Sequence, residues 1–252
     1  MDPTKRFSSR VDNYINARPR YPEEIISILR EDCGLTPGAS VADIGSGTGI
    51  LTEMFLRNGN DIFAVEPNAG MREAGERLLA DDPKFHSVAG RAEATTLADR
   101  SVEVVAAGQA FHWFDRDLAR QEFVRILKPA GWVVLIWNER LTGTTAFLQA
   151  YEHLLERYGT DYTQVNHRHI DERLLRAFYG PDGFTSRVLG NRQDFDYAGL
   201  EGRLLSSSYT PEPGHPNYAP MLVALARIFE ANQHEGRVAF EYATKLYYGR
   251  LT

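Results

Sequence analysis

The stretch VADIGSGTG, residues 41–49, joins a short apolar run to a helical pattern through a turn that contains three glycines. The run over 41–44 is typical of a buried strand, and the apolar spacing over 51–56 is helical until Asn58 and Gly59 end it. Glycines in such a turn let a ligand approach the backbone, because they carry no side chains. The stretch therefore predicts a strand, a ligand-binding turn and a helix.

The same alternation continues along the chain. Further strands are predicted over 61–66, 85–88, 101–107 and 131–137, and helices over 22–34, 68–80 and 115–127. Strands that alternate with helices predict an α/β fold, in which a doubly wound, mostly parallel sheet has helices on both faces. Ligands of such sheets bind outside the carboxyl ends of the strands, so residues that follow strands are the site candidates.

Beyond residue 138 the alternation weakens. Helices are predicted over 147–158, 172–178 and 221–230, a final strand over 238–251, and a less regular strand pattern over 184–197. The segment 211–220 contains four prolines, which indicates a surface connection that belongs to a lid. We expect one domain over residues 1–252.

Composition narrows the function classes. The 252 residues carry 28 Lys and Arg against 34 Asp and Glu, and this formal charge of −6 disfavours nucleic acid as a partner. Cys33 is the single cysteine, so neither an internal disulfide nor a thiolate metal cluster is expected. The first twenty residues are polar, and no apolar run reaches membrane-spanning length. We expect a cytoplasmic protein with no membrane partner, and the oligomeric state stays open.

The turn itself selects among nucleotide-like ligands. Ile50 occupies the position where dinucleotide folds need a small residue, and Asp43 places a carboxylate where it would repel a pyrophosphate. No lysine follows the glycines, which excludes a P-loop. The same carboxylate suits a ligand with an ammonium and a sulfonium. Glu66, at the end of the second strand, is placed to accept from ribose hydroxyls, although a helix-capping role stays open for both acids.

Five segments together resemble a known family: VADIGSGTGILTEMF, AVEPNAGM, GRAEAT, SVEVVAAGQAFHWFD and RILKPAGWVVLIWN. Their order and spacing are similar to the motifs of class I S-adenosylmethionine-dependent methyltransferases. The resemblance extends to the small-molecule branch that includes trans-aconitate methyltransferase-like proteins. The N-terminal stretch YINARPRYP resembles the entry segment of that branch. It implies a seven-stranded Rossmann-like sheet, a cofactor-binding core over 36–140, and cover or lid segments over 1–30 and about 143–235.

The resemblance also implies a set of residues for S-adenosylmethionine and for its product S-adenosylhomocysteine. Asp43 would hold the ammonium, Glu66 the ribose, and Ala92 with Glu93 the adenine, whereas Met71 is equally consistent with ordinary core. The full cofactor set is Tyr14, Arg18, Asp43, Gly45, Ser46, Gly47, Thr48, Gly49, Glu66, Pro67, Met71, Ala92, Glu93, Gln109 and Ala110. Arg91 departs from the acidic residue that many relatives carry there.

The acceptor is expected beside the aromatic loop that follows the fourth strand. The candidate residues are Phe111, His112, Trp113, Trp137, Arg140 and Tyr209. His112 is a candidate general base or a structural hydrogen-bond partner, and Arg140 a clamp for an acceptor carboxylate or a surface arginine. No metal-ligand spacing is present, so no metal is expected. The hypothesis is in-line methyl transfer to an oxygen or nitrogen of a small molecule; the alternatives are a non-catalytic S-adenosylmethionine-binding protein and an NAD-dependent oxidoreductase.

Overall fold

A computed structural model describes residues 18–162, 172–207 and 209–251. Its strands form a seven-stranded sheet in the order β3-β2-β1-β4-β5-β7-β6. The strands are β1 (Ser40–Ile44), β2 (Asp61–Val65), β3 (Phe85–Val88), β4 (Val102–Gly108), β5 (Leu127–Arg140), β6 (Thr185–Phe195) and β7 (Val238–Gly249). The order reverses between β1 and β4, which places the predicted switch point directly beside the glycine turn.

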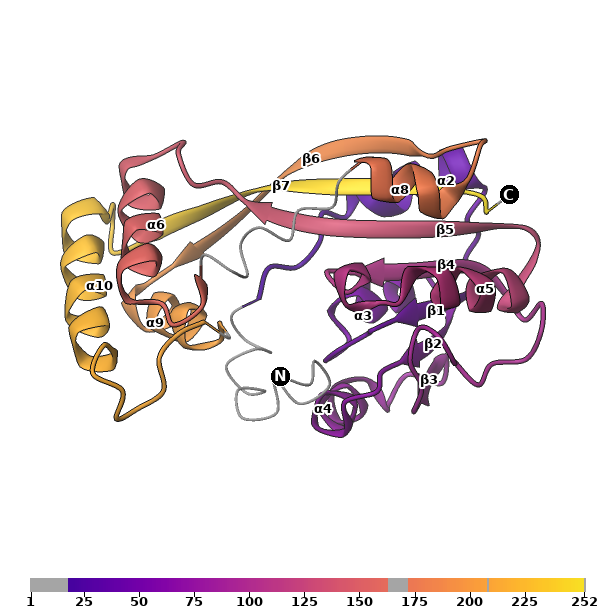
Figure 1. The fold of residues 1–252 in the computed structure, drawn as a ribbon, viewed down its shortest axis with the longest axis horizontal. Helices are drawn as coiled ribbons and strands as arrows, with labels where there is room; N and C mark the ends of the chain where they lie inside the picture. Colours follow the sequence, from indigo (N-terminus) through magenta and orange to yellow (C-terminus); the bar gives the residue numbers. More distant parts are fainter. Residues whose placement is uncertain (1–17, 163–171, 208, 252) are drawn as a thin grey trace.

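Helices cover both faces of the sheet, as the alternating pattern predicts (Figure 1). They are α2 (Glu24–Cys33), α3 (Ile50–Arg57), α4 (Ala69–Leu79), α5 (Arg116–Ile126), α6 (Ala146–Tyr158), α8 (Glu172–Tyr179), α9 (Tyr197–Leu205) and α10 (Tyr218–Asn232), with a short 3-10 helix η2 (Phe111–Trp113). One apolar core joins α2 and α3 to the sheet, and a second joins α5 and α8 to its other face. Both cores contain buried apolar side chains of β1, β4 and β5, so the sheet is closely packed on both faces at these strands.

The sheet is mixed. Strands β1 to β5 pair in parallel, whereas β7 pairs antiparallel with both β5 and β6. Buried and half-buried residues alternate along β7 as far as Tyr248. This pattern matches a strand that has one face in the core and the other face partly covered. The less regular strand pattern predicted over 184–197 corresponds to β6, so the segment 143–235, expected as cover, also supplies a strand of the sheet.

Strand β5 is longer than predicted. It extends to Arg140, which pairs with Tyr242 of β7, so Trp137 and Arg140 lie inside the strand and not after it. The far ends of β5, β6 and β7 run beyond the parallel strands and carry α6, α9 and α10 (Figure 1). A third apolar core fills this extension. No helix within the described ranges is long and apolar enough to cross a lipid bilayer.

Candidate functional site

The glycine turn after β1 has the conformation that its sequence requires. Gly45 and Gly47 both have positive φ angles, 70° and 59°. A side chain at Gly45 would meet the Cβ atom of Ala110 at 2.7 Å, which real side chains do not tolerate. The backbone amides of Gly45 and Ser46 donate to the carbonyl of Val65, at 2.8 and 3.2 Å. The turn is therefore fixed between the ends of β2 and β4.

Asp43 is the buried acid of the turn. Its side chain has no exposed surface, and Oδ2 accepts a hydrogen bond of 2.7 Å from the hydroxyl of Thr52. Oδ1 has no hydrogen-bond partner among the described residues. Burial raises the pKa of Asp43 to about 7, even though the hydrogen bond from Thr52 lowers it. Buried acceptor atoms are normally hydrogen-bonded, so an unpaired oxygen in this turn is suited to accept from an N–H group of a ligand.

Glu66 connects the two loops that flank the turn. It is 8% exposed; Oε2 accepts from the amide of Gly47 at 2.9 Å, and Oε1 accepts from the amide of Asn68 at 2.8 Å. Burial also raises the pKa of Glu66. Each carboxylate oxygen has a second lone pair, so these bonds leave acceptor capacity for a diol. The N-cap of α4 is Asn68, whose side chain accepts from the amide of Met71 at 3.0 Å, so the capping interpretation of Glu66 is wrong and the ribose interpretation stays a prediction.

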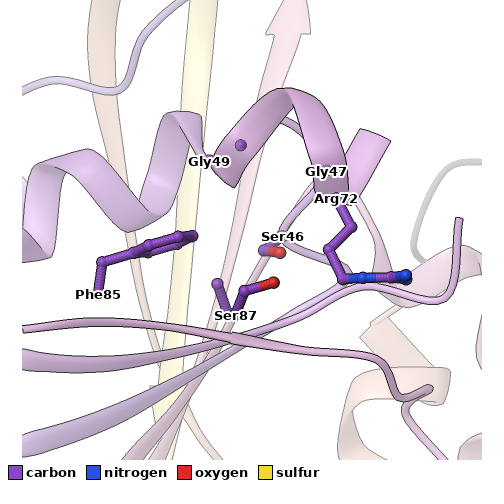
Figure 2. Close-up of a pocket in the computed structure, with 8 residues that line it drawn as sticks. Ser46, Gly47, Gly49, Arg72, Phe85 and Ser87 are labelled. Atoms are coloured by element: carbon purple, nitrogen blue, oxygen red, sulfur yellow. The ribbon is translucent and has the colours of Figure 1, made fainter. Parts of the chain in front are cut away.

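A small pocket lies between the glycine turn, α4 and β3 (Figure 2). Its lining consists of Ser46, Gly47, Gly49, Ala64, Arg72, Gly75, Phe85 and Ser87. In this view the hydroxyls of Ser46 and Ser87 lie between the ring of Phe85 and the guanidinium of Arg72. Arg72 donates to the carbonyl of Glu66 at 3.1 Å. The pocket adjoins the predicted cofactor turn, and none of the predicted acceptor residues lines it.

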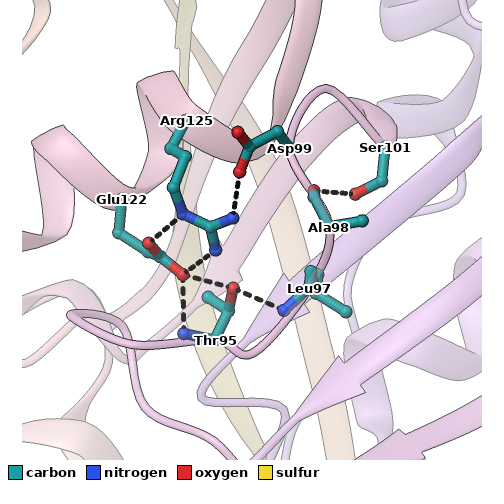
Figure 3. A network of polar contacts seen from close by, with 7 residues as sticks. All are labelled: Thr95, Leu97, Ala98, Asp99, Ser101, Glu122 and Arg125. Atoms are coloured by element: carbon teal, nitrogen blue, oxygen red, sulfur yellow. Dashed lines mark hydrogen bonds and ion pairs between the residues drawn. The ribbon is translucent and has the colours of Figure 1, made fainter.

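The loop after β3, which contains Ala92 and Glu93, is fastened to α5 (Figure 3). Glu122 accepts from both the amide and the hydroxyl of Thr95, at 2.7 and 2.6 Å, and from two nitrogens of Arg125. Arg125 is the main reason that the pKa of Glu122 falls to about 2. This network holds the loop in place at the end of the sheet.

Within that loop Ala92 is buried, and the carboxylate of Glu93 has local partners. Its Oε1 accepts from the amide of Asp115 at 2.8 Å, and its Oε2 lies 3.3 Å from Nε of Arg91. The predicted adenine contact of Glu93 stays a prediction. Arg91, which departs from the family pattern, here compensates the charge of Glu93.

We expect Glu122→Gln to lower the free energy of unfolding at neutral pH by about 1–3 kcal/mol, because it weakens several charge-assisted hydrogen bonds. The pKa of Glu122 is lowered by folding, so its stabilisation is present above the unfolded pKa near 4.5 and is lost as the pH falls toward 2. Urea unfolding at several pH values measures both effects. Asp99→Asn is the control, since its side chain is 75% exposed and its pairing with Arg125 should contribute under about 1 kcal/mol. Equal losses in both variants would contradict the assignment.

The aromatic loop after β4 divides into a core part and a site part. Phe111 is 1% exposed, and its ring lies 4.7 Å from that of Phe178 in the core. The structure therefore does not favour the predicted contact of Phe111 with an acceptor, because its ring packs against α8 in the core. His112 is half-buried, and its ring lies 4.7 Å from Trp113 and 5.7 Å from Trp137. These three rings are brought together at the end of β4 and β5.

Gln109 and Asn138 form a polar junction between β4 and β5. The sequence patterns predict Gln109 only as a cofactor residue and do not predict a role for Asn138. Gln109 has a positive φ of 55°, and its side chain bonds the backbone of Asn138 at 3.0 and 3.3 Å. The amide of Asn138 accepts from Thr244 at 2.5 Å and from Asn191 at 3.1 Å, and it donates to the carbonyl of Arg20 at 3.2 Å. A polar residue in the apolar run GWVVLIWN is the signal that points to Asn138.

The remaining predicted residues lie toward the extension. Arg18 donates to the carbonyl of Ser206 at 3.0 Å, and the ring of Tyr209 lies 4.9 Å from that of Tyr162. Arg140 is buried, with 11% of its side chain exposed, which excludes the surface interpretation. Tyr14 lies outside the described residues. Within the described ranges no group of three or more His, Cys, Asp or Glu residues is arranged to hold a metal ion.

Comparisons with known proteins agree with this geometry. A family model described as a methyltransferase domain matches residues 42–135. The chain is 38% identical over 141 residues to an uncharacterised methyltransferase of Mycobacterium tuberculosis, covering 55% of this chain and 54% of that protein. It is 32% identical over 154 residues to an uncharacterised methyltransferase of Schizosaccharomyces pombe, covering 61% and 60%. The aligned region thus spans little more than half the length of these relatives.

Solved structures share the fold. A putative type II methyltransferase from Anaeromyxobacter dehalogenans superposes with a TM-score of 0.67 at 20% identity, over 93% of this chain and 98% of that one. A putative methyltransferase from an antibiotic biosynthesis pathway of Anabaena variabilis superposes with a TM-score of 0.61 at 20% identity, over 94% and 100%. Both likenesses extend over the antiparallel edge and the helical extension as well as the parallel strands.

Proposed function

We propose that this chain, whose residues 42–135 match a methyltransferase domain model, transfers a methyl group from S-adenosylmethionine to a small molecule. The observation that supports this best is the buried carboxylate of Asp43, with one oxygen lacking a donor at the glycine turn. An ammonium supplies both the missing N–H donor and the opposite charge.

The residues of the turn fit the proposed cofactor. Asp43 would bind the ammonium, Glu66 would accept from the ribose hydroxyls, and the amides of 45–49 would lie against the methionine part. Pro67, Met71 and Ala92 would line the adenine, and Gln109 with Ala110 would border the methyl group. Bound S-adenosylmethionine supplies a methyl group that its sulfonium already activates. The protein then contributes orientation, exclusion of water and electrostatic fit, which suffice for an in-line displacement.

The acceptor is proposed to bind beside His112, Trp113 and Trp137, at the half of the switch-point crevice that lies over β4 and β5. The three rings provide flat apolar surface and faces that attract positive charge. His112 would accept the proton of an acceptor hydroxyl or amine if methylation is at oxygen or nitrogen. The order of the motifs and the segment YINARPRYP support the small-molecule branch that includes trans-aconitate methyltransferase-like proteins.

The cover segments belong to the same proposal. Residues 18–21 lie across the sheet edge, where Arg20 pairs with Glu53 and its carbonyl accepts from Asn138 and Asn191. A segment held by both the core and the extension is suited to close over a bound cofactor, and we assign Tyr14 and Arg18 to that cofactor from the family resemblance. We propose 1–30 and 143–235 as cover of a single domain, and a cytoplasmic location.

The experiment is a search for bound ligand followed by a transfer assay. Mass spectrometry of molecules that copurify with the protein should find S-adenosylmethionine or S-adenosylhomocysteine. Labelled methyl should then pass from S-adenosylmethionine to members of a panel of acids, phenols, amines and heterocycles. Cofactor binding without transfer to any acceptor would favour the non-catalytic alternative. NADH binding would favour the oxidoreductase, which Ile50 and Asp43 oppose.

A further inference from the structure

Two buried arginines lie together in the helical extension. Arg140 is at the end of β5, with 11% of its side chain exposed, and Arg203 is in α9, with 6% of the residue exposed. Arginine is almost never buried to this degree unless its charge is compensated. The partners of these two guanidinium groups are therefore informative.

Their polar partners account for only part of their donors. Arg140 pairs through Nη2 with the carboxylate of Glu152 and donates to the hydroxyl of Tyr162 at 2.9 Å, but its buried Nη1 has no hydrogen-bond partner among the described residues. Arg203 donates through Nη1 to the hydroxyl of Ser207 at 3.0 Å, but its buried Nε has no partner within the same part of the chain. Within the described residues Arg203 has no ion pair with a carboxylate.

A third donor without a partner belongs to the same cluster. The hydroxyl of Tyr151 in α6 is buried and has no hydrogen-bond partner in the described ranges, while its ring lies 5.2 Å from the guanidinium carbon of Arg140. The guanidinium carbon of Arg203 lies 5.8 Å from the ring of Phe240, which is itself 4.8 Å from the ring of Tyr151, so both arginines lie beside this phenol. Three buried donor atoms from three elements, β5, α6 and α9, thus lack an acceptor in one place.

The charge balance is also incomplete. Among the residues that the structure describes, the two guanidinium groups face one paired carboxylate, that of Glu152, and otherwise phenols. Burial raises the pKa of Tyr209, but the charges of Arg203, Arg140 and Arg18 outweigh burial, so that the pKa is lowered. A buried cation without a counter-ion costs several kcal/mol, as does each unsatisfied buried donor. An anion with several oxygen acceptors would remove both costs.

We propose that Arg140, Arg203 and Tyr151 form an oxyanion-binding site that holds a carboxylate or phosphate group of the methyl acceptor. The assignment of this anion to the acceptor rests on the proposed function. Planar guanidinium groups match the paired oxygens of both anions. The site is close to the reaction edge, because Arg140 lies three residues beyond Trp137 in β5, about 10 Å along the strand. Arg18 links the cover segment to it through the carbonyl of Ser206.

The test is calorimetric titration of the whole protein with succinate, with inorganic phosphate and with neutral succinamide at low ionic strength. At least one anion should bind, and succinamide should not. The preferred anion identifies the acceptor class as carboxylate or phosphate. Arg203→Gln and Arg140→Gln should each weaken anion binding at least about tenfold, the scale of a lost charge-assisted hydrogen bond. Arg176→Gln is the control, since this arginine is on α8 with 66% of its side chain exposed.

Tyr151→Phe keeps the test decisive if an arginine variant fails to fold. It removes a hydroxyl without a partner and keeps the ring, so the protein should remain as stable as wild type in urea. Anion binding should nevertheless weaken several-fold. Anion affinity that is equal in wild type, Tyr151→Phe and the arginine variants would overturn the site. A second result would also overturn the site: the anions bind no more strongly than succinamide, and the near-ultraviolet phenolate absorbance shows that Tyr209 is ionised at neutral pH.

The two proposals fail in different ways. Methyl transfer to neutral acceptors, with no effect of Arg203→Gln on their turnover, would overturn the anion assignment and leave the proposed function intact. Anion binding that depends on Arg203 in a protein that does not bind S-adenosylmethionine would overturn the proposed function and leave the oxyanion site intact.

Discussion

Asp43→Asn is expected to weaken S-adenosylmethionine binding by about 1–3 kcal/mol, or roughly 5- to 150-fold, because it removes the charge that pairs with the ammonium. Asparagine keeps the size of the side chain and an oxygen that accepts from Thr52, so the fold should persist. Glu66→Ala should weaken binding on the same scale through the ribose. Calorimetric titration measures both. Unchanged affinity in both variants would contradict the proposed position of the cofactor.

The affinity of wild-type protein should also depend on pH in a way that Asp43→Asn does not share. Burial raises the pKa of Asp43 to about 7, so the carboxylate that pairs with an ammonium becomes populated as the pH rises through that value. Binding of S-adenosylhomocysteine should therefore strengthen from about pH 6 to 8 in wild type only. Using one ligand for both proteins cancels the titration of the ligand itself. Parallel pH profiles would contradict this role of Asp43.

The same shift has a consequence for stability without ligand. A carboxyl group whose pKa is raised by folding retains its proton in the native state while the unfolded chain loses it. Stability is therefore lost as the pH rises from the unfolded value of 3.8 toward 7. Asp43→Asn should lack this loss and be relatively more stable than wild type near pH 7.

Asn138→Leu is expected to lower the free energy of unfolding by about 2–4 kcal/mol. The hydroxyl of Thr244, a residue with no exposed surface, loses its acceptor. The leucine also replaces a side-chain amide that has three polar partners. Adding Thr244→Val should restore part of the loss, because a pair of apolar groups leaves no unsatisfied hydroxyl. Urea unfolding of wild type, both single variants and the double variant measures this coupling.

A matched control separates the junction from the strand itself. Ile136→Val lies two residues earlier in β5, is equally buried and should cost only about 0.5–1.5 kcal/mol. Asn138→Leu should in addition weaken the attachment of residues 18–21, since it removes one of the two amide donors to the carbonyl of Arg20 and leaves that of Asn191. A single-variant loss no larger than that of Ile136→Val, with no recovery in the double variant, would show that the junction contributes little.

Much of the fold is predictable from local patterns. The parallel strands β1 to β4 and the helices between them occur where the periodicity places them, within a few residues. The glycine turn has the positive φ angles that its glycines permit, and the acids Asp43 and Glu66 both lie buried beside it. The strands, the helices and the turn conformation depend on interactions between residues close in sequence, which spacing and residue type describe directly.

The candidate site is less predictable, because its other parts depend on contacts between distant segments. Phe111 was expected at the acceptor, but α8 supplies Phe178 and draws its ring into the core. Arg203 has no motif, and its significance arises only where α9 meets the end of β5 and α6. No local pattern distinguishes such an arginine from a solvated one, since the difference is burial.

Sequence alone was sufficient for the succession of core strands and helices along the chain, the glycine turn and the methyltransferase resemblance, since each is encoded by neighbouring residues. The antiparallel edge, the length of β5 and the Asn138 junction required the folded chain: Thr244 and Asn138 are 106 positions apart, and Arg20 and Asn138 are 118 apart. Pairing at such separations is selected by the packing of whole elements and by the satisfaction of buried polar groups. Neither quantity exists until the chain is compact.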